Sequence, residues 1–165
     1  MATTETESSG SPDVSGAGSM TYRPGAAPKK PQVWMVPGIP YDLSSHREFI
    51  NAVREGIPGT LVKSVIESSG MRDIFVGVLN VSSSNLSRLY MRKHLDRGSS
   101  ENVLDTVRLL NQAGLVWESE KLVKEWLNSP VPALNGDRPI DLIDTSEGRR
   151  WVSKILTKIE HGEFS

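Results

Sequence analysis

Apolar residues recur at helical spacing from Ser44 to the C-terminus, and this periodicity constrains the fold more than any other feature of the sequence. Repeats every three or four residues place apolar side chains on one face of an α-helix, whereas a half-buried strand requires strict alternation. Glycine, proline or a Ser/Thr cap separates the apolar stretches, as at helix ends. No segment alternates convincingly, so the sequence predicts an all-α fold.

Seven helices are expected, with one further helical turn in the Pro-rich stretch 131–144. The first is expected to bury Phe49, Ile50 and Val53. The expected helices cover approximately 45–55, 60–69, 71–79, 83–94, 99–113, 119–127 and 145–161. The expected N-caps are Ser45 (with Glu48 in a capping box), Thr60, Ser82, Ser99 or Ser100, Ser119, and Asp144 or Thr145. Helices are expected to stop at Gly56, Gly70, Gly114 and Gly162.

Three regions follow from this pattern: a disordered tail over 1–43, a first helical domain over 44–114 and a second over 115–165. The tail is rich in Ser, Thr, Gly, Ala and Pro, and such a composition cannot bury enough apolar surface to offset the entropy of ordering. Its most apolar run, Val33 to Val36, can dock as an extended arm on a partner or on the body, or cover the first helix. Met20 is an alternative start of translation.

Composition excludes several classes of protein. The chain of 165 residues carries 19 basic and 20 acidic residues, so it is not a polycation that coats nucleic acid or anionic lipid. It has no cysteine, which removes disulfides, thiol nucleophiles and Cys-ligated zinc. No apolar stretch is long enough for a membrane helix, and the first residues do not resemble a secretory signal. We expect a cytoplasmic protein.

The third and fourth expected helices match a helix-turn-helix, with Asn80 as the turn residue. Asparagine tolerates the positive φ that such a turn requires better than any residue except glycine. The positions that wedge the two helices together are all apolar: Phe75, Leu79, Val81, Leu86 and Leu89. Val76 departs from the motif, because a small residue usually stands where the helices cross.

A helix-turn-helix reads DNA with the exposed N-terminal half of its second helix. Arg88 is the candidate for a bidentate contact with guanine and Asn85 for adenine. Arg92, Lys93 and Arg97 would contact phosphates. The full set of expected DNA-binding residues is Ser82, Ser83, Ser84, Asn85, Ser87, Arg88, Arg92 and Lys93. The alternative is a solvated charged helix face. One module contacts few base pairs, so we expect at least a homodimer.

The C-terminal region carries the most specific pattern in the sequence. From Trp126 to Gly148 it reads W-L-x-x-P-x-x-A-L-x-G-x-x-P-x-D-L-x-D-T-x-x-G, which fixes many residue types at fixed spacing. This string and the helix after it strongly resemble the toxin-binding domain of the Xre/MbcA/ParS antitoxins. That family also carries a preceding helix-turn-helix, so the resemblance covers about Leu61 to Ser165.

The resemblance implies a type II toxin-antitoxin module in which this chain is the antitoxin and represses its own operon. The implied partner is a RES-domain toxin, which belongs to a family of small enzymes that deplete cellular NAD. The C-terminal domain of the antitoxin is implied to bind this toxin and obstruct its active site. A different class of function remains open: a stand-alone dimeric helix-turn-helix regulator whose second domain only dimerises. Co-expression with the neighbouring gene product would separate the two.

Most of the C-terminal string is expected to be structural. Core positions are Trp126, Leu127, Ala133, Leu134, Leu142 and Trp151, and Gly148 is expected to permit close approach of a neighbouring segment. The exposed ends are better candidates for contact with the toxin, and Phe164 could anchor a C-terminal plug in a partner's cleft. The full set is Arg149, Arg150, Lys154, His161, Gly162, Glu163, Phe164 and Ser165.

We find no pattern for catalysis, a cofactor or a metal site. The three histidines, His46, His94 and His161, fall in separate elements without a helical partner, so neither a zinc pair nor a nucleophile and base is indicated. The serines at 82–84 have neither a glycine loop nor a nearby base. We therefore expect any enzymatic activity to belong to the partner.

Overall fold

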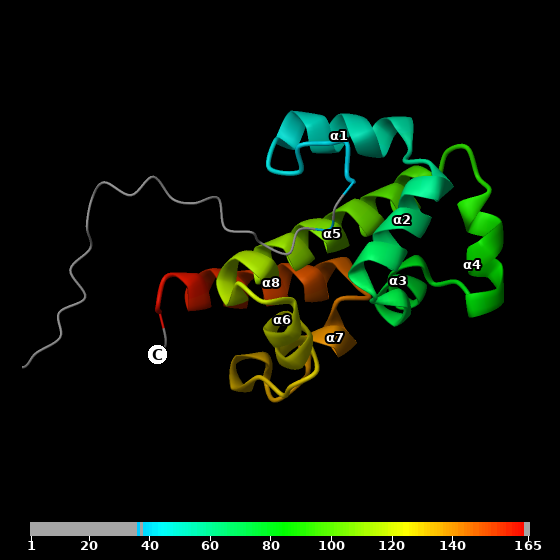
Figure 1. Ribbon diagram of the computed structural model, residues 1–165. Helices are drawn as coiled ribbons and strands as arrows, with labels where there is room; N and C mark the ends of the chain where they lie inside the picture. The colour runs from blue at the N-terminus through cyan, green and yellow to red at the C-terminus, as the bar shows by residue number, and fades with distance from the viewer. Residues whose placement is uncertain (1–35, 37, 164–165) are drawn as a thin grey trace, which may run out of the picture.

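The computed structural model describes Val36 and residues 38–163, and within them the fold is all-α, as predicted. Its elements are α1 (His46–Glu55), α2 (Gly59–Ser69), α3 (Arg72–Leu79), α4 (Ser83–Tyr90), α5 (Arg97–Trp117), α6 (Glu120–Leu127), the 3-10 turn η1 (Pro132–Leu134), α7 (Pro139–Leu142) and α8 (Ser146–Glu160). Figure 1 shows α4 at one end of the molecule and α8 lying beneath α5.

Helix α5 is the centre of the fold, because α1, α3, α6 and α8 all pack against it. Its inward residues Val103, Leu104, Val107 and Leu110 are completely buried. They join a single apolar core that extends from Val36 to Leu156. The boundary predicted between residues 114 and 115 lies inside α5, so this helix belongs to both predicted domains.

Four of the expected N-caps are confirmed. The side chains of Ser45, Ser82, Ser119 and Thr145 each accept a hydrogen bond from the backbone N–H three residues later. Each cap supplies an acceptor for one of the N–H groups that a helix start leaves unpaired.

The caps predicted for α2 and α5 are wrong. Helix α2 starts at Gly59 after Pro58, which places Thr60 inside the helix. Helix α5 starts earlier than predicted, because the Asp96 carboxylate accepts from the N–H and the hydroxyl of Ser99. These two hydrogen bonds lower the pKa of Asp96 below its usual 3.8.

Two helix ends and the buried face of α1 also differ from prediction. Gly114 does not stop α5: it is buried, and the helix continues to Trp117, where Glu118 adopts a left-handed conformation with φ 51°. Helix α4 ends at Tyr90 instead of residue 94. In α1 the buried residues are Phe49 and Ala52, whereas Ile50 is 46% exposed, because the three-residue step from Phe49 leads to Ala52.

The segment before α1 is packed where the structure describes it. Val36 and Leu43 are buried, and the Val36 N–H donates to Asn111 Oδ1 of α5 at 3.1 Å. The prediction of disorder over 1–43 therefore does not hold for Val36 and residues 38–43. Residues 1–35 lie outside the described part of the chain, as do 37, 164 and 165.

No helix within residues 36 and 38–163 combines the length with the hydropathy that crossing a bilayer requires.

Candidate functional site

The connection between α3 and α4 has the geometry of a helix-turn-helix. Asn80 lies in the left-handed region with φ 49° and ψ 46°, and its N–H donates to Gly77 O. Of the wedge residues, Phe75, Leu86 and Leu89 are buried, while Leu79 and Val81 are half-buried against the same core. The predicted turn residue is confirmed, and all five predicted wedge residues are buried or half-buried in the core.

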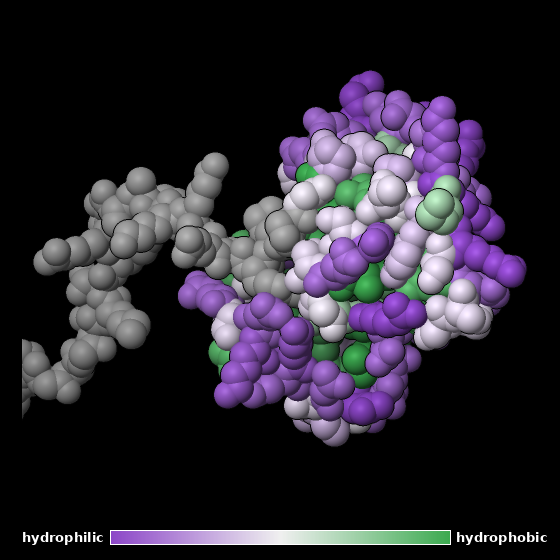
Figure 2. All heavy atoms as spheres, turned by 45° about the vertical axis from the view of Figure 1, so that its right-hand side comes forward, coloured by the Kyte–Doolittle hydropathy of each residue, from purple (hydrophilic) through white to green (hydrophobic). Residues whose placement is uncertain are grey.

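The outer face of α4 is polar and mostly uncharged. Ser82 to Asn85, Ser87 and Arg88 are all exposed. The Ser82 hydroxyl accepts from Asn85 N at 3.3 Å, and Arg72 of α3 donates to the carbonyl of Ser83 at 3.0 Å. Figure 2, in which this side of the molecule comes forward, shows hydrophilic side chains around a paler centre. Small hydroxyl side chains leave the start of α4 open to close approach by a ligand.

The residues after α4 form a loop anchored to the start of α2. The N–H of Gly59 donates to Arg92 O at 2.9 Å, and Leu95 N donates to Ile57 O at 2.8 Å. A side-chain carbon at Gly59 would collide with the carbonyl oxygen of Leu89. These contacts hold Arg92 and Lys93 exposed beside the end of α4.

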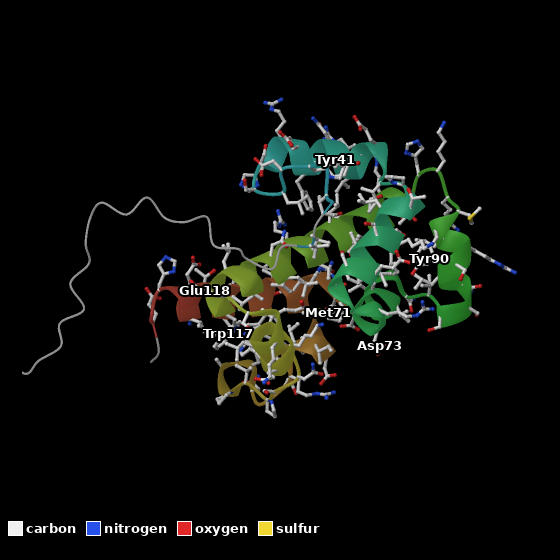
Figure 3. The ribbon with its side chains drawn as sticks, in the orientation of Figure 1. Tyr41, Met71, Asp73, Tyr90, Trp117 and Glu118 are labelled. Atoms are coloured by element: carbon white, nitrogen blue, oxygen red, sulfur yellow. The ribbon has the colours of Figure 1, made fainter. Side chains whose placement is uncertain are left out.

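Tyr90, the last residue of α4, lies between α4 and the α2–α3 pair (Figure 3). Burial raises the pKa of its phenol above the usual 10, so the side chain is neutral at physiological pH.

The connection from α6 to α8 is a tight series of turns, as predicted. Val131 N donates to Asp137 O at 3.1 Å, and Arg138 makes a bidentate ion pair with Asp141 at 2.7 and 2.8 Å. The pair lowers the pKa of the Asp141 carboxyl and raises the pKa of the Arg138 guanidinium. Ala133, expected in the core, is exposed, because its neighbour Leu134 is the residue of η1 that points inward.

Gly148 near the start of α8 permits the close approach that was predicted. A Cβ atom there would overlap the carbonyl of Leu142, so no other residue fits without a shift. Leu142 and Trp151 are half-buried against the core, and Leu127 and Leu134 are fully buried. The residues of the C-terminal string therefore hold the start of α8 against α7.

Arg149 is buried, which corrects the expectation that its side chain is exposed for contact with a partner. It is 2% exposed, and its guanidinium donates to Asp105 Oδ2 and Asn102 Oδ1 of α5, each at 2.7 Å, and to the carbonyl of Ile143 at 3.0 Å. Arg108 donates to the other Asp105 oxygen at 2.7 Å. With a longer contact to the carbonyl of Asp144 at 3.5 Å, the Arg149 guanidinium has four partners inside the protein.

The exposed face of α8 carries a row of basic side chains, which we call the α8 basic row: Arg150, Lys154, Lys158 and His161. Positions four and eight residues apart fall on one side of a helix. Arg150 is paired with Glu147 at 2.8 Å, and the His161 ring bonds the carbonyl of Thr157 at 2.8 Å. The sequence analysis missed Lys158, which its spacing of four from Lys154 could have revealed.

Helix α8 ends where Gly162 was predicted to stop it. Gly162 has φ 68°, its N–H donates to Ile159 O, and Glu163 N donates to Lys158 O. This pair of bonds is the Schellman motif. It turns the chain away from the helix axis, with Gly162 and Glu163 exposed. Phe164 and Ser165, also predicted to contact the toxin, lie outside the described residues.

A groove of about 1060 Å³ runs between the segment before α1, helix α5 and helix α8. Its walls include Leu43, Leu109 and Leu115 as apolar groups, with Arg150 and Lys154 at the α8 edge. Among the described residues, no group of three or more His, Cys, Asp or Glu side chains is placed to hold a metal ion.

Comparison with known proteins agrees with this geometry. The family described as the antitoxin Xre/MbcA/ParS C-terminal toxin-binding domain matches residues 112–162. The Prs ADP-ribosylating antitoxin of Sphingobium sp. (strain YBL2) is 30% identical over 146 residues, which cover 67% of this chain and 92% of that protein. Antitoxin Xre of Photorhabdus laumondii is 27% identical over 142 residues, with coverage of 81% and 90%. Antitoxin Xre of Yersinia enterocolitica is 24% identical over 149 residues, with coverage of 87% and 98%.

The similarity to the Sphingobium protein extends over nearly all of that relative, and the family match spans the end of α5 and all of α6 to α8. The resemblance noted from the string between Trp126 and Gly148 is thereby confirmed. This chain belongs to the Xre/MbcA/ParS family of antitoxins.

Proposed function

We propose that this antitoxin has two activities: it represses its own operon through α3 and α4, and it neutralises a NAD-depleting toxin of the RES family through α8 and the residues after it. The observation that carries the first activity is the helix-turn-helix geometry at Asn80, which presents the exposed face of α4. Family membership carries the second, since an antitoxin implies a cognate toxin.

DNA recognition would be divided between the exposed face of α4 and the loop that follows it. Arg88 would make a bidentate contact with guanine, Asn85 would read adenine, and the exposed serines would bond bases or phosphates. Arg92 and Lys93 would pair with phosphates, which makes binding dependent on salt. One module reads few base pairs, so we propose a homodimer on two half-sites one helical turn apart.

Toxin recognition would use the α8 basic row. Its four side chains are exposed on one face, so the matching surface of the toxin is expected to be acidic. The residues from Gly162 to Ser165 would enter the active site, with Phe164 as the apolar anchor. The name of the Sphingobium relative refers to ADP-ribosylation, a reaction that consumes NAD, and this supports a NAD-using enzyme as the target.

The toxin assignment is tested by co-expression with the product of the neighbouring gene. The intact chain should copurify with it and rescue growth, whereas deletion of Gly162 to Ser165 or Lys154→Glu should weaken rescue. Lys63→Glu on α2 makes the same charge change at another exposed lysine and should leave rescue intact. A neighbouring protein that is not toxic would favour the stand-alone regulator instead.

The DNA assignment is tested by gel shift on the protein's own promoter. Arg88→Ala combined with Arg92→Ala should weaken binding by about 10-fold to 100-fold, because one base contact and one phosphate contact are lost. Lys121→Ala combined with Lys154→Ala removes the same two charges from α6 and α8 and should bind normally. Equal DNA binding by both double variants would contradict the assignment of α4 and the loop after it to DNA binding.

A further inference from the structure

Met91, directly after α4, is an exposed apolar side chain that the proposed DNA contacts leave unused. It is 86% exposed, more than any other large apolar residue in the described part of the chain. Its backbone keeps the helical conformation, with φ −83° and ψ −7°, and its N–H donates to Arg88 O at 3.3 Å. The helical spacing of α4 therefore continues to this residue.

This spacing places Met91 on the face of α4 that is proposed to read bases. Arg88 stands three residues before Met91, and Ser84 stands four residues before Arg88, so the three side chains form one stripe. All three are exposed, whereas Leu86 and Leu89 are buried on the other side of the helix. The stripe thus presents a hydroxyl, a guanidinium and an apolar thioether in succession.

The charge around the stripe favours an anionic ligand over an apolar protein surface. Between Asp73 and Asp96 the sequence has no acidic residue, but it has three exposed basic ones: Arg88, Arg92 and Lys93. The carboxylate of Asp96 is hydrogen-bonded at the start of α5. A polyanion would be attracted to this surface, whereas the same basic surface of a second copy would be repelled.

Thymine is the base that an apolar side chain can recognise in the major groove, because its C5-methyl group is exposed there. Methionine is unbranched and polarisable, so its side chain adapts to such a group. We propose that Met91 contacts a thymine methyl group of the operator, which adds thymine to the bases that α4 distinguishes. This inference rests on the proposed DNA binding and names a further base contact within it.

Replacement of thymine by deoxyuridine tests the contact, because deoxyuridine pairs as thymine does but lacks the methyl group. The promoter duplex is prepared with dUTP in place of dTTP, and the ratio of the affinities for the two duplexes gives the methyl sensitivity. The wild-type protein should bind the deoxyuridine duplex more weakly by at least about 4-fold, the contribution of one buried methyl group. Met91→Ala should lower the methyl sensitivity by about 4-fold for each half-site.

Arg92→Ala is the matched control, because Arg92 is the next residue and is proposed to contact a phosphate, which carries no methyl group. This variant should bind both duplexes more weakly and keep the methyl sensitivity of the wild type. Met91 is almost fully exposed, so the circular dichroism of Met91→Ala should match that of the wild type.

A methyl sensitivity of Met91→Ala equal to that of the wild type would overturn the role of Met91 and leave the proposed DNA binding intact. Loss of dimerisation by Met91→Ala without DNA, measured by sedimentation, would also overturn it, since a second copy would then cover the residue. A wild-type protein that binds neither duplex would contradict the proposed repression itself, and this inference with it.

Discussion

At the scale of single residues, Arg149 shows how a side chain that sequence patterns place at the surface can be structural. It bonds Asp105 and Asn102 on α5 and the carbonyl of Ile143 just before α8. A buried guanidinium is stable only when its charge is paired and its N–H groups have acceptors. This side chain therefore joins the start of α8 to the middle of α5.

Replacement of Arg149 should reveal this structural role. Arg149→Met should lower the free energy of unfolding by about 3 kcal/mol, because Asp105 Oδ2, Asn102 Oδ1 and the carbonyl of Ile143 lose their donor. Arg150→Met removes an exposed ion pair from the next position in α8 and should change it by less than about 1 kcal/mol. Urea unfolding of both variants measures the difference, and equal effects would contradict the role of Arg149.

At the scale of elements, the position of α4 depends on its contact with the start of α2. Gly59 lies against the carbonyls of Leu89 and Tyr90. Gly56, at the end of α1, is similarly close to the carbonyl of Leu95. Two glycines thus allow the α1–α2 connection to hold both sides of the loop that carries Arg92 and Lys93.

Substitution of glycine by alanine should have opposite effects in two neighbouring helices. Gly59→Ala should lower the free energy of unfolding by about 1–3 kcal/mol, because the added methyl group collides with backbone. Gly77→Ala in α3 should raise it by about 0.5–1 kcal/mol, since its Cβ would meet nothing closer than Asp144 Cβ at 3.9 Å and the unfolded chain loses freedom. Thermal unfolding of the two variants compares them, and stabilisation by Gly59→Ala would refute the close contact.

At the scale of the whole molecule, one helix contacts both halves of the chain. Helix α5 contacts α1 and α3 of the N-terminal half and α6 and α8 of the C-terminal half, and all of these share one core. A core that crosses the boundary between two halves should make them unfold together.

Unfolding monitored by two probes tests this coupling. Tryptophan fluorescence reports mainly on the C-terminal half, which holds Trp117, Trp126 and Trp151, whereas far-UV circular dichroism reports on all helices. We expect the two urea transitions to coincide. A helical signal that persists after the fluorescence transition is complete would show that the first half folds independently.

Much of the candidate site follows from the sequence because local chemistry decides it. The turn at Asn80 depends on a residue that tolerates positive φ, and the cap at Ser82 depends on a side chain that bonds a nearby N–H group. The exposed face of α4 follows from helical spacing. The same holds for Gly148, where the string from Trp126 to Gly148 predicted a close approach. Each of these features involves residues within a few positions of one another.

The errors concern residues whose neighbours are distant in the sequence. Arg149 is buried because Asp105 and Asn102, more than forty positions away, accept its hydrogen bonds. Gly114 continues α5 because the helix is packed on both sides, which outweighs the preference of glycine for helix ends. Val36 is buried because Asn111 holds its backbone.

The sequence by itself therefore determined the helical class, the helix-turn-helix and membership of the antitoxin family, since these depend on periodicity and on local spacing. Only the tertiary structure decided which charged side chain of α8 is structural and which form an exposed basic row. It also decided that α5 joins the two halves. The physical reason is that burial and ion pairing depend on contacts between distant segments, and helical periodicity does not specify those contacts.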